Sequence, residues 1–259
     1  MKEQEDRCRS EHGAILHELL NIGEMMLANG AEIKRVEDTL ERMGSACGAK
    51  RMNVFVITSS IVVTMLFEDG EEVTQTRRIV KPAGTDFRKL EDLNELSRRF
   101  CANPLTSEQL HSEVEKLVQK KDHYRLKCYL GSILAAGGFA VFFGGSLWDG
   151  LAAAVFAAFV CLMQRYLDPF CTNRVAFNVI CSFLTGVGIC LAARWIPVLN
   201  ADKIMIGDIM LLIPGIALTN SVRDILVGDT ISGAMRLIEA LLWAGALACG
   251  FMAAIWVVM

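Results

Sequence analysis

CYLGSILAAGGFAVFFGGSLW, residues 128–148, decides the fold, because it runs for 21 residues without a charged side chain. A helix needs about 20 apolar residues to cross the roughly 30 Å of hydrocarbon in a bilayer. The stretch therefore predicts a membrane-spanning helix. Within it Ser132, Ala136, Ala140 and Gly144 recur every four positions. This spacing indicates either a face where a second helix packs closely or the ordinary richness of membrane helices in small residues.

The charged residues divide the chain into two parts. Residues 128–259 hold only 6 of the 26 lysines and arginines and 7 of the 29 acidic residues, so the first 127 residues are the polar part. We expect a cytoplasmic domain at 1–122 and a transmembrane helical domain at 123–259. The near balance of charge leaves no basic field for nucleic acid, so nucleic-acid binding is excluded.

Five stretches of the second part are long and apolar enough to be considered as spans. The second is interrupted by Arg165, which can snorkel toward the headgroups, and the fourth contains Asp208 and the pair Pro214–Gly215. The expected spans lie at about 128–148, 150–167, 175–194, 204–222 and 237–259.

The orientation follows from the basic residues in the short loops. Residues 120–127 place four cations before the first span, and the later loops alternate in the same sense, with Arg165 and Arg174 inside. The N-terminus has no apolar segment typical of a secretory signal. We therefore expect the N-terminus in the cytoplasm and the C-terminus outside.

The polar part alternates between two kinds of periodicity. Residues 10–46 predict two amphipathic helices that are separated by the stop signal Asn29–Gly30. Three β-rich runs at 52–58, 61–67 and 72–80 predict an antiparallel sheet, and two further helices follow, the second opened by a Thr106 cap. The expected fold class is an α+β cytoplasmic domain, made of helices and a three-stranded antiparallel sheet, followed by an all-α transmembrane bundle of about five helices.

Enzymatic and metal chemistry find little support. The nine cysteines are scattered singly and the four histidines lie apart from them, so we expect reduced thiols, no metal and no cofactor. The chain lacks a phosphate-binding glycine loop and a nucleophile elbow. Glu32, Arg35 and Glu37 share one short helix, but Lys34 and neighbouring acids form the i,i+4 pairs of any solvated helix. We expect a protein that is not an enzyme.

Asp208 is the strongest candidate for chemistry in the membrane, because a charge at that depth is costly and marks function by default. Six residues later Pro214–Gly215 predicts a helix break that frees backbone groups to bind a solute. Asp208 would then exchange a proton. The alternative is that it lies near the outer headgroups.

Other polar residues of this part are candidates for the solute and for the proton. Thr219, Asn220 and Arg223 can bind a small carboxylate, and Asn178 faces a polar path or hydrogen-bonds between helices. The alternative for Arg223 and Asp224 is that they start a cytoplasmic loop, and Asp229 can cap the next helix. Asp224, Asp229 and Glu239 are further proton-coupling candidates, and Arg236 is spaced to pair with Glu239.

Three motifs in order resemble the threonine/serine exporter family. They are PGIALTNSVRDILVGDTISGAMR at 214–236, GAE at 30–32 with RVEDT at 35–39, and RRIV at 77–80 running into DLNELSR at 92–98. The resemblance implies export of small amino acids or related small carboxylates such as succinate, across the bacterial inner membrane and driven by the proton motive force. It also singles out Glu32, Arg35, Glu37 and Arg236 as motif positions.

Single-chain members of that family look about twice as rich in spans as this sequence. The resemblance is therefore to the N-terminal half of a split, two-component exporter, which implies a second small membrane protein as partner. The alternative is a membrane-anchored sensor or assembly subunit without a transport path of its own. In that case removal of charges in the spans is harmless, whereas changes at Arg35 or Glu37 are not.

Overall fold

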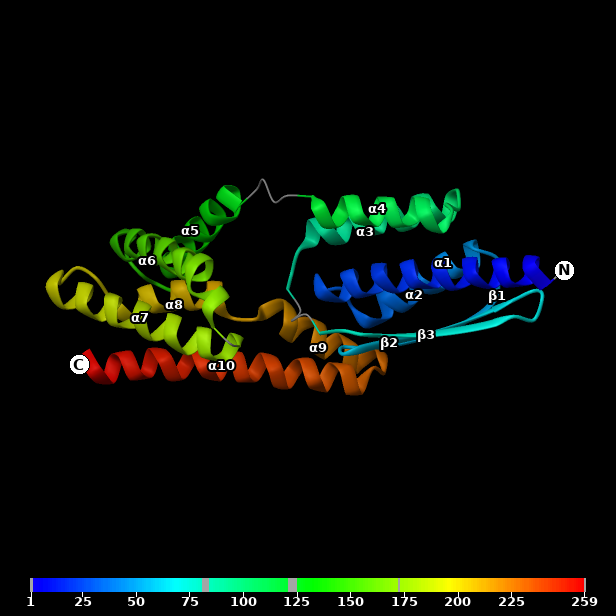
Figure 1. Cartoon of the computed structure of the whole chain (residues 1–259). Helices are drawn as coiled ribbons and strands as arrows, with labels where there is room; N and C mark the ends of the chain where they lie inside the picture. The colour runs from blue at the N-terminus through cyan, green and yellow to red at the C-terminus, as the bar shows by residue number, and fades with distance from the viewer. Residues whose placement is uncertain (1, 81–83, 121–124, 172, 259) are drawn as a thin grey trace. The chain divides into compact units, whose positions relative to one another are not determined.

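The computed structural model describes the backbone of residues 2–80, 84–120, 125–171 and 173–258. The chain forms two compact units (Figure 1). The first unit is Met1–Lys121 together with Thr219–Arg236, and the second is Asp122–Leu218 together with Leu237–Met259. Each unit is described by itself. Residues 121–124, part of the basic segment on which the expected orientation depends, lie outside the described residues.

Four helices of the first unit come from the polar part of the chain. They are α1 (Lys2–Ala28), α2 (Ile33–Ala46), α3 (Phe87–Ala102) and α4 (Ser107–Gln119). Helix α1 stops where Gly30 takes a φ of +90°, a conformation that costs glycine little. Helix α4 begins at a capping box in which the Thr106 hydroxyl accepts from Gln109 N–H and the Gln109 side chain accepts from Thr106 N–H.

A three-stranded antiparallel sheet lies between α2 and α3 in the chain. Its strands are β1 (Ala49–Ile57), β2 (Ser60–Phe67) and β3 (Glu72–Arg78), in the order β1-β2-β3. Val63 of β2 is opposite Val54 of β1 and Gln75 of β3. Alternate residues of β2 are buried, as expected of a sheet with one face on a core.

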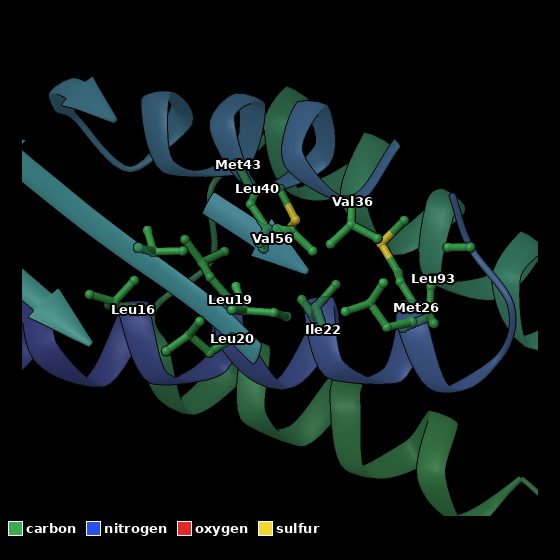
Figure 2. Close-up of a cluster of buried hydrophobic side chains, with 14 of the residues drawn as sticks. Leu16, Leu19, Leu20, Ile22, Met26, Val36, Leu40, Met43, Val56 and Leu93 are labelled. Carbon is green, nitrogen blue, oxygen red and sulfur yellow. The ribbon is translucent and has the colours of Figure 1, made fainter. Parts of the chain in front are cut away.

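The core of this unit joins both kinds of element. Figure 2 shows side chains from α1, α2, β1 and α3 meeting in one cluster. Burial of each large aliphatic side chain contributes about 1.5–3 kcal/mol, far more than helix propensity does. Packing on this core therefore holds the helices in place. The labelled residues are Leu16, Leu19, Leu20, Ile22, Met26, Val36, Leu40, Met43, Val56 and Leu93.

The second unit is helical in its described part. It contains α5 (Arg125–Phe142), α6 (Leu147–Tyr166), a short 3-10 helix (Asp168–Phe170), α7 (Arg174–Trp195) and α8 (Ala201–Leu212). Two more helices, α9 (Gly215–Val227) and α10 (Thr230–Val258), each cross from one unit to the other. Ala136 and Ala140 of α5 are fully buried, and a side chain at Gly207 of α8 would meet the Ala136 carbonyl. The small residues of α5 thus allow close packing within the chain itself.

The expected number of five spans is wrong. Among the described residues, three helices, α6, α7 and α10, are long and apolar enough to cross a membrane, and the count is four if α8 and α9 form one broken span. The apolar part of α5, Leu126–Phe142, has 17 residues, which cover only about 25 Å. The cause is a turn inside the charge-free stretch 128–148: Gly144 has a φ of +90°, and Ser146 caps α6. The stretch is therefore divided between two helices.

The expected fold class, with a separate cytoplasmic α+β domain, is also wrong. The described residues form ten α-helices and only one small sheet, and the first compact unit includes Thr219–Arg236 from late in the chain. Asn220 and Arg236 donate hydrogen bonds to the backbone carbonyls of Gly30 and Ala31, respectively. These contacts join the two segments, so the N-terminal part is not a domain set apart from the rest.

Candidate functional site

Asp208 of α8 is a fully buried carboxylate. Neither of its oxygens has a hydrogen-bond partner among the described residues. Burying a charge without a partner costs far more than burying an apolar group of the same size. Gly207 beside it packs against α5 so closely that a larger side chain would not fit. The fold therefore encloses Asp208 without compensating its charge.

Two thiols, one from α6 and one from α7, lie near Asp208. The thiols of Cys161 and Cys181 lie within electrostatic range of its carboxylate. Thr185, one turn beyond Cys181, is fully buried. Ser182 donates to the carbonyl of Asn178 in its own helix at 2.7 Å, so its hydroxyl does not bridge two helices. The polar face of α7 thus reaches the surroundings of Asp208.

A cavity of about 230 Å³ lies among α6, the 3-10 helix, α7 and the end of α8. The guanidinium of Arg174 lies 5.2 Å from the ring centre of Trp243, within the range of a cation–π contact. Asn178 is 3% exposed. Sequence reasoning selected Asn178 as a site residue but not Arg174, although the i,i+4 spacing of the two was a usable signal. The lining residues are Gln164, Asp168, Arg174, Phe177, Asn178, Leu211 and Leu212.

The helix is interrupted directly after this cavity. Helix α8 ends at Leu212 and α9 begins at Gly215, with a bend of 55° between them. Pro214 cannot donate a backbone hydrogen bond, and its ring disfavours helical geometry in the preceding residue. The break therefore has a local cause in the sequence.

Four charged residues of the first unit form what we call the arginine cluster: Glu32, Arg223, Asp224 and Arg236. The Arg223 Nη1 atom lies 2.6 Å from Glu32 Oε1, and Arg236 Nη1 lies 3.0 Å from Asp224 Oδ2. Arg236 also donates from Nη2 to the carbonyl oxygen of Ala31 at 3.0 Å. The segments 30–32 and 220–236, far apart in sequence, thus meet through two ion pairs.

The two ion pairs differ in burial. The side chains of Asp224 and Arg236 are 3% and 11% exposed, whereas that of Arg223 is 63% exposed. An exposed pair contributes about 0.2–1 kcal/mol. Removing one partner of a buried pair costs about 3–5 kcal/mol, because the other charge stays uncompensated. The Asp224–Arg236 pair is therefore the stronger determinant of this arrangement.

The remaining candidates are distributed over both units. Glu37 accepts a hydrogen bond from Val56 N–H at 3.3 Å, and burial raises the pKa of its carboxyl above the usual range. Arg35 and Thr219 are exposed. Asp229 precedes α10, and its carbonyl accepts from Gly233 N–H. Glu239 is exposed on α10 in the second unit, and Arg236 pairs with Asp224 and not with Glu239.

One group of potential metal ligands occurs among the described residues. His12, Asp69 and Glu71 each bring a ligand atom within 4.8 Å of the others. His12 Nδ1 lies 2.9 Å from Glu71 Oε2, and Asp69 accepts from the Glu71 backbone N–H. These contacts account for the grouping without an ion.

Comparisons with known proteins bear on both units. The family described as "Putative threonine/serine exporter" matches residues 17–258. The "Probable threonine/serine exporter" of Mycobacterium tuberculosis is 23% identical over 92% of this chain and 45% of its own length. The "Threonine/serine exporter" of Corynebacterium glutamicum is 22% identical over 93% of this chain and 50% of its own length. The chain therefore spans about half the length of these two relatives.

A shorter relative matches along most of its length. The "Probable succinate transporter subunit YjjP" of Escherichia coli is 25% identical over 86% of this chain and 86% of its own. No solved structure matches. Both the family match and the apolar helices indicate a membrane protein; these helices are α6, α7 and α10. Because the family match covers almost the whole sequence, this chain belongs to the threonine/serine exporter family.

Proposed function

We propose that this chain is a subunit of an exporter of small solutes that carry a carboxylate, either amino acids such as threonine and serine or dicarboxylates such as succinate. The export is driven by the proton motive force across the bacterial inner membrane. The names of the relatives support the solute class, since two are called threonine/serine exporters and another a succinate transporter subunit.

The observation that carries the proposal is Asp208, fully buried and without a hydrogen-bond partner among the described residues. An ionised carboxylate is costly in such surroundings, and contact with water removes that cost. A carboxyl group that is enclosed in one state and hydrated in another takes up and releases a proton in step with the change. The break between α8 and α9 lies six residues away and gives the helix a place to bend.

We assign the uptake and release of the coupling proton to Asp208 in preference to Asp224, because the carboxylate of Asp224 already forms an ion pair with Arg236 at 3.0 Å. Asp229 and Glu239 are less enclosed than Asp208. The Nη1 atom of Arg223 is already paired with Glu32 at 2.6 Å. We therefore assign Arg223, Asn220 and their partners to holding α9 against residues 30–32.

A second membrane subunit completes the exporter in this proposal. The relatives that this chain matches along most of their length are named as subunits, and those named as exporters are about twice as long as the matched part. The partner would supply what the second half of the longer relatives supplies.

The test is solute efflux from bacterial cells that lack the gene. The cells are preloaded with threonine, serine or succinate and complemented with this chain alone or with a second membrane protein encoded beside it. We expect one solute class to be exported only when both are present, and Asp208→Asn to abolish that export without loss of the protein from the membrane. Asp202→Asn is the matched control, since Asp202 lies on the same helix and its side chain is 72% exposed.

Unchanged export by Asp208→Asn would remove Asp208 from the mechanism. If no solute pool changes in any combination, the protein is a sensor or assembly subunit. Substitutions at Arg35 or Glu37 should then be the ones with an effect in vivo.

A further inference from the structure

The cavity between α6, α7 and α8 carries one positive and one negative side chain at its wall. Arg174 begins α7 and Asp168 begins the short 3-10 helix, and the amides of Gln164 and Asn178 lie in the same lining. The wall is therefore polar and, counted over its charged groups, neutral. Such a wall suits a ligand that has both charges itself.

The polar groups of this cavity are not paired with one another. Asn178 is 97% buried, and its side-chain amide makes no hydrogen bond among the described residues. Arg174 and Asp168 form no ion pair within the part of the chain that the structure describes. The atoms of this amide are not fully enclosed, and Asn178 lines the cavity, so the amide is open to it. Its presence at a cavity is explained if a ligand supplies the missing hydrogen bond.

We propose that this cavity is the binding subsite for a small zwitterionic solute. The guanidinium of Arg174 holds the carboxylate, Asp168 holds the ammonium group, and the Asn178 amide bonds to the carboxylate or to a side-chain hydroxyl. This inference rests on the proposed export function and narrows its solute class. Arginine suits the role because its planar fork bonds both oxygens of a carboxylate.

The size of the cavity limits the ligand. A volume of 230 Å³ corresponds to about eight water molecules at about 30 Å³ each. A hydroxy amino acid of three or four carbons has seven or eight heavy atoms and fits this space. Larger amino acids would need the cavity to widen.

The charges of the wall also discriminate between the two solute classes. A dicarboxylate bound at Arg174 would bring its second carboxylate toward Asp168, where like charges repel. A zwitterion brings its ammonium group to the same place. The present wall therefore favours a zwitterion, and removal of the charge of Asp168 should shift the preference toward a dicarboxylate.

The cavity is connected to the buried acid through α7. Cys181 lies about one turn beyond Asn178 and within electrostatic range of Asp208. A solute that bonds to Asn178 thus lies one helical turn from the surroundings of the carboxyl group that we assign to the proton. The arrangement offers a short route by which binding and protonation can influence each other.

The test is equilibrium binding of L-threonine and of succinate to the purified full-length protein in detergent. We expect Arg174→Gln and Asn178→Leu to weaken threonine binding at least tenfold. Asp168→Asn should weaken threonine binding about tenfold and strengthen succinate binding, a change of preference that misfolding cannot produce. The controls are Arg194→Gln, at the other end of α7, and Asp202→Asn, an exposed acid of α8.

The outcomes separate this subsite from the export function. If the wild type exports threonine and Asp168→Asn and Arg174→Gln bind and export it equally well, the subsite is refuted and the export function stands. If threonine binds as expected but no solute is exported with either complement, the subsite stands and the export function fails. If neither threonine nor succinate binds the purified wild type, the subsite is refuted whatever the export result.

Discussion

Loss of one partner of the Asp224–Arg236 pair should destabilise the protein far more than loss of the neighbouring pair. The two side chains are 3% and 11% exposed, and 3.0 Å separates Arg236 Nη1 from Asp224 Oδ2. Either Asp224→Asn or Arg236→Gln leaves a buried charge uncompensated, at a cost of about 3–5 kcal/mol. The arginine substitution also removes the hydrogen bond to the Ala31 carbonyl.

The matched comparison is Glu32→Gln or Arg223→Gln, in a pair whose arginine is 63% exposed. There the expected cost is below about 1 kcal/mol. For chains of 150–250 residues a loss of 1 kcal/mol lowers the midpoint of thermal unfolding by about 2–4 °C. The buried pair should therefore lower the midpoint by roughly 6–20 °C and the exposed pair by less than about 4 °C.

The assay is the midpoint of thermal unfolding of each purified variant in one detergent. The double variant Asp224→Asn with Arg236→Gln removes both charges, so it should be less destabilised than the sum of the single variants. Equal shifts for the buried and the exposed pair, or strictly additive shifts in the double variant, would refute the reasoning. Either result would mean that the buried pair does not hold residues 220–236 against residues 30–32.

Three further predictions concern other parts of the fold. The hydrogen bond from His111 to Glu18 raises the pKa of His111. The stability that this hydrogen bond gives the folded protein is therefore complete below the ordinary histidine pKa and is lost as pH rises through the raised pKa. His111→Asn should lower the unfolding midpoint at pH 5.5 and not at pH 9. Gly30→Ala should cost about 1 kcal/mol or more, because Gly30 has a φ of +90°, and chemical denaturation checks this. Gly207→Ala should cost about 1–3 kcal/mol by pressing on the Ala136 carbonyl, measured as the unfolding midpoint in detergent.

The sequence predicted elements well wherever a local signal marks the boundary. The Asn29–Gly30 stop, the Thr106 cap and the alternation of the three strands all act within a few residues. The predicted number of spans was wrong because one helix boundary has no such local signal. A run of 21 uncharged residues says nothing about the backbone at Gly144, where a φ of +90° ends one helix before the next begins.

The candidate sites show the same limit. Asp208 and the segment 214–236 stood out because charge, proline and glycine are unusual in an apolar run. The partner of Arg236 could not be inferred, because the local i,i+3 spacing favoured Glu239, whereas the turn at Gly228 brings Asp224 to the guanidinium. Arg174 and Asp168 each look like an ordinary loop charge until the helices are assembled around one cavity.

The two fully buried acids of the second unit show why the isolation of Asp208 points to function. Asp149 is as buried as Asp208, but its carboxylate accepts from the Ser146 and Asn200 backbone N–H groups, both at 2.7 Å, and from both of their side chains. The same fold thus satisfies one buried carboxylate fully and leaves the other without any described partner. We infer that Asp149 serves the structure and that Asp208 does not.

This contrast can be tested with the same substitution at both positions. Asp149→Asn weakens hydrogen bonds to a charged acceptor, worth about 1.5–3 kcal/mol each, so the unfolding midpoint should fall. Asp208→Asn removes a charge that nothing compensates, so the midpoint should stay the same or rise while solute efflux is lost. If Asp208→Asn is as destabilising as Asp149→Asn, the carboxylate of Asp208 has a structural partner. The assignment of proton exchange to Asp208 would then be wrong.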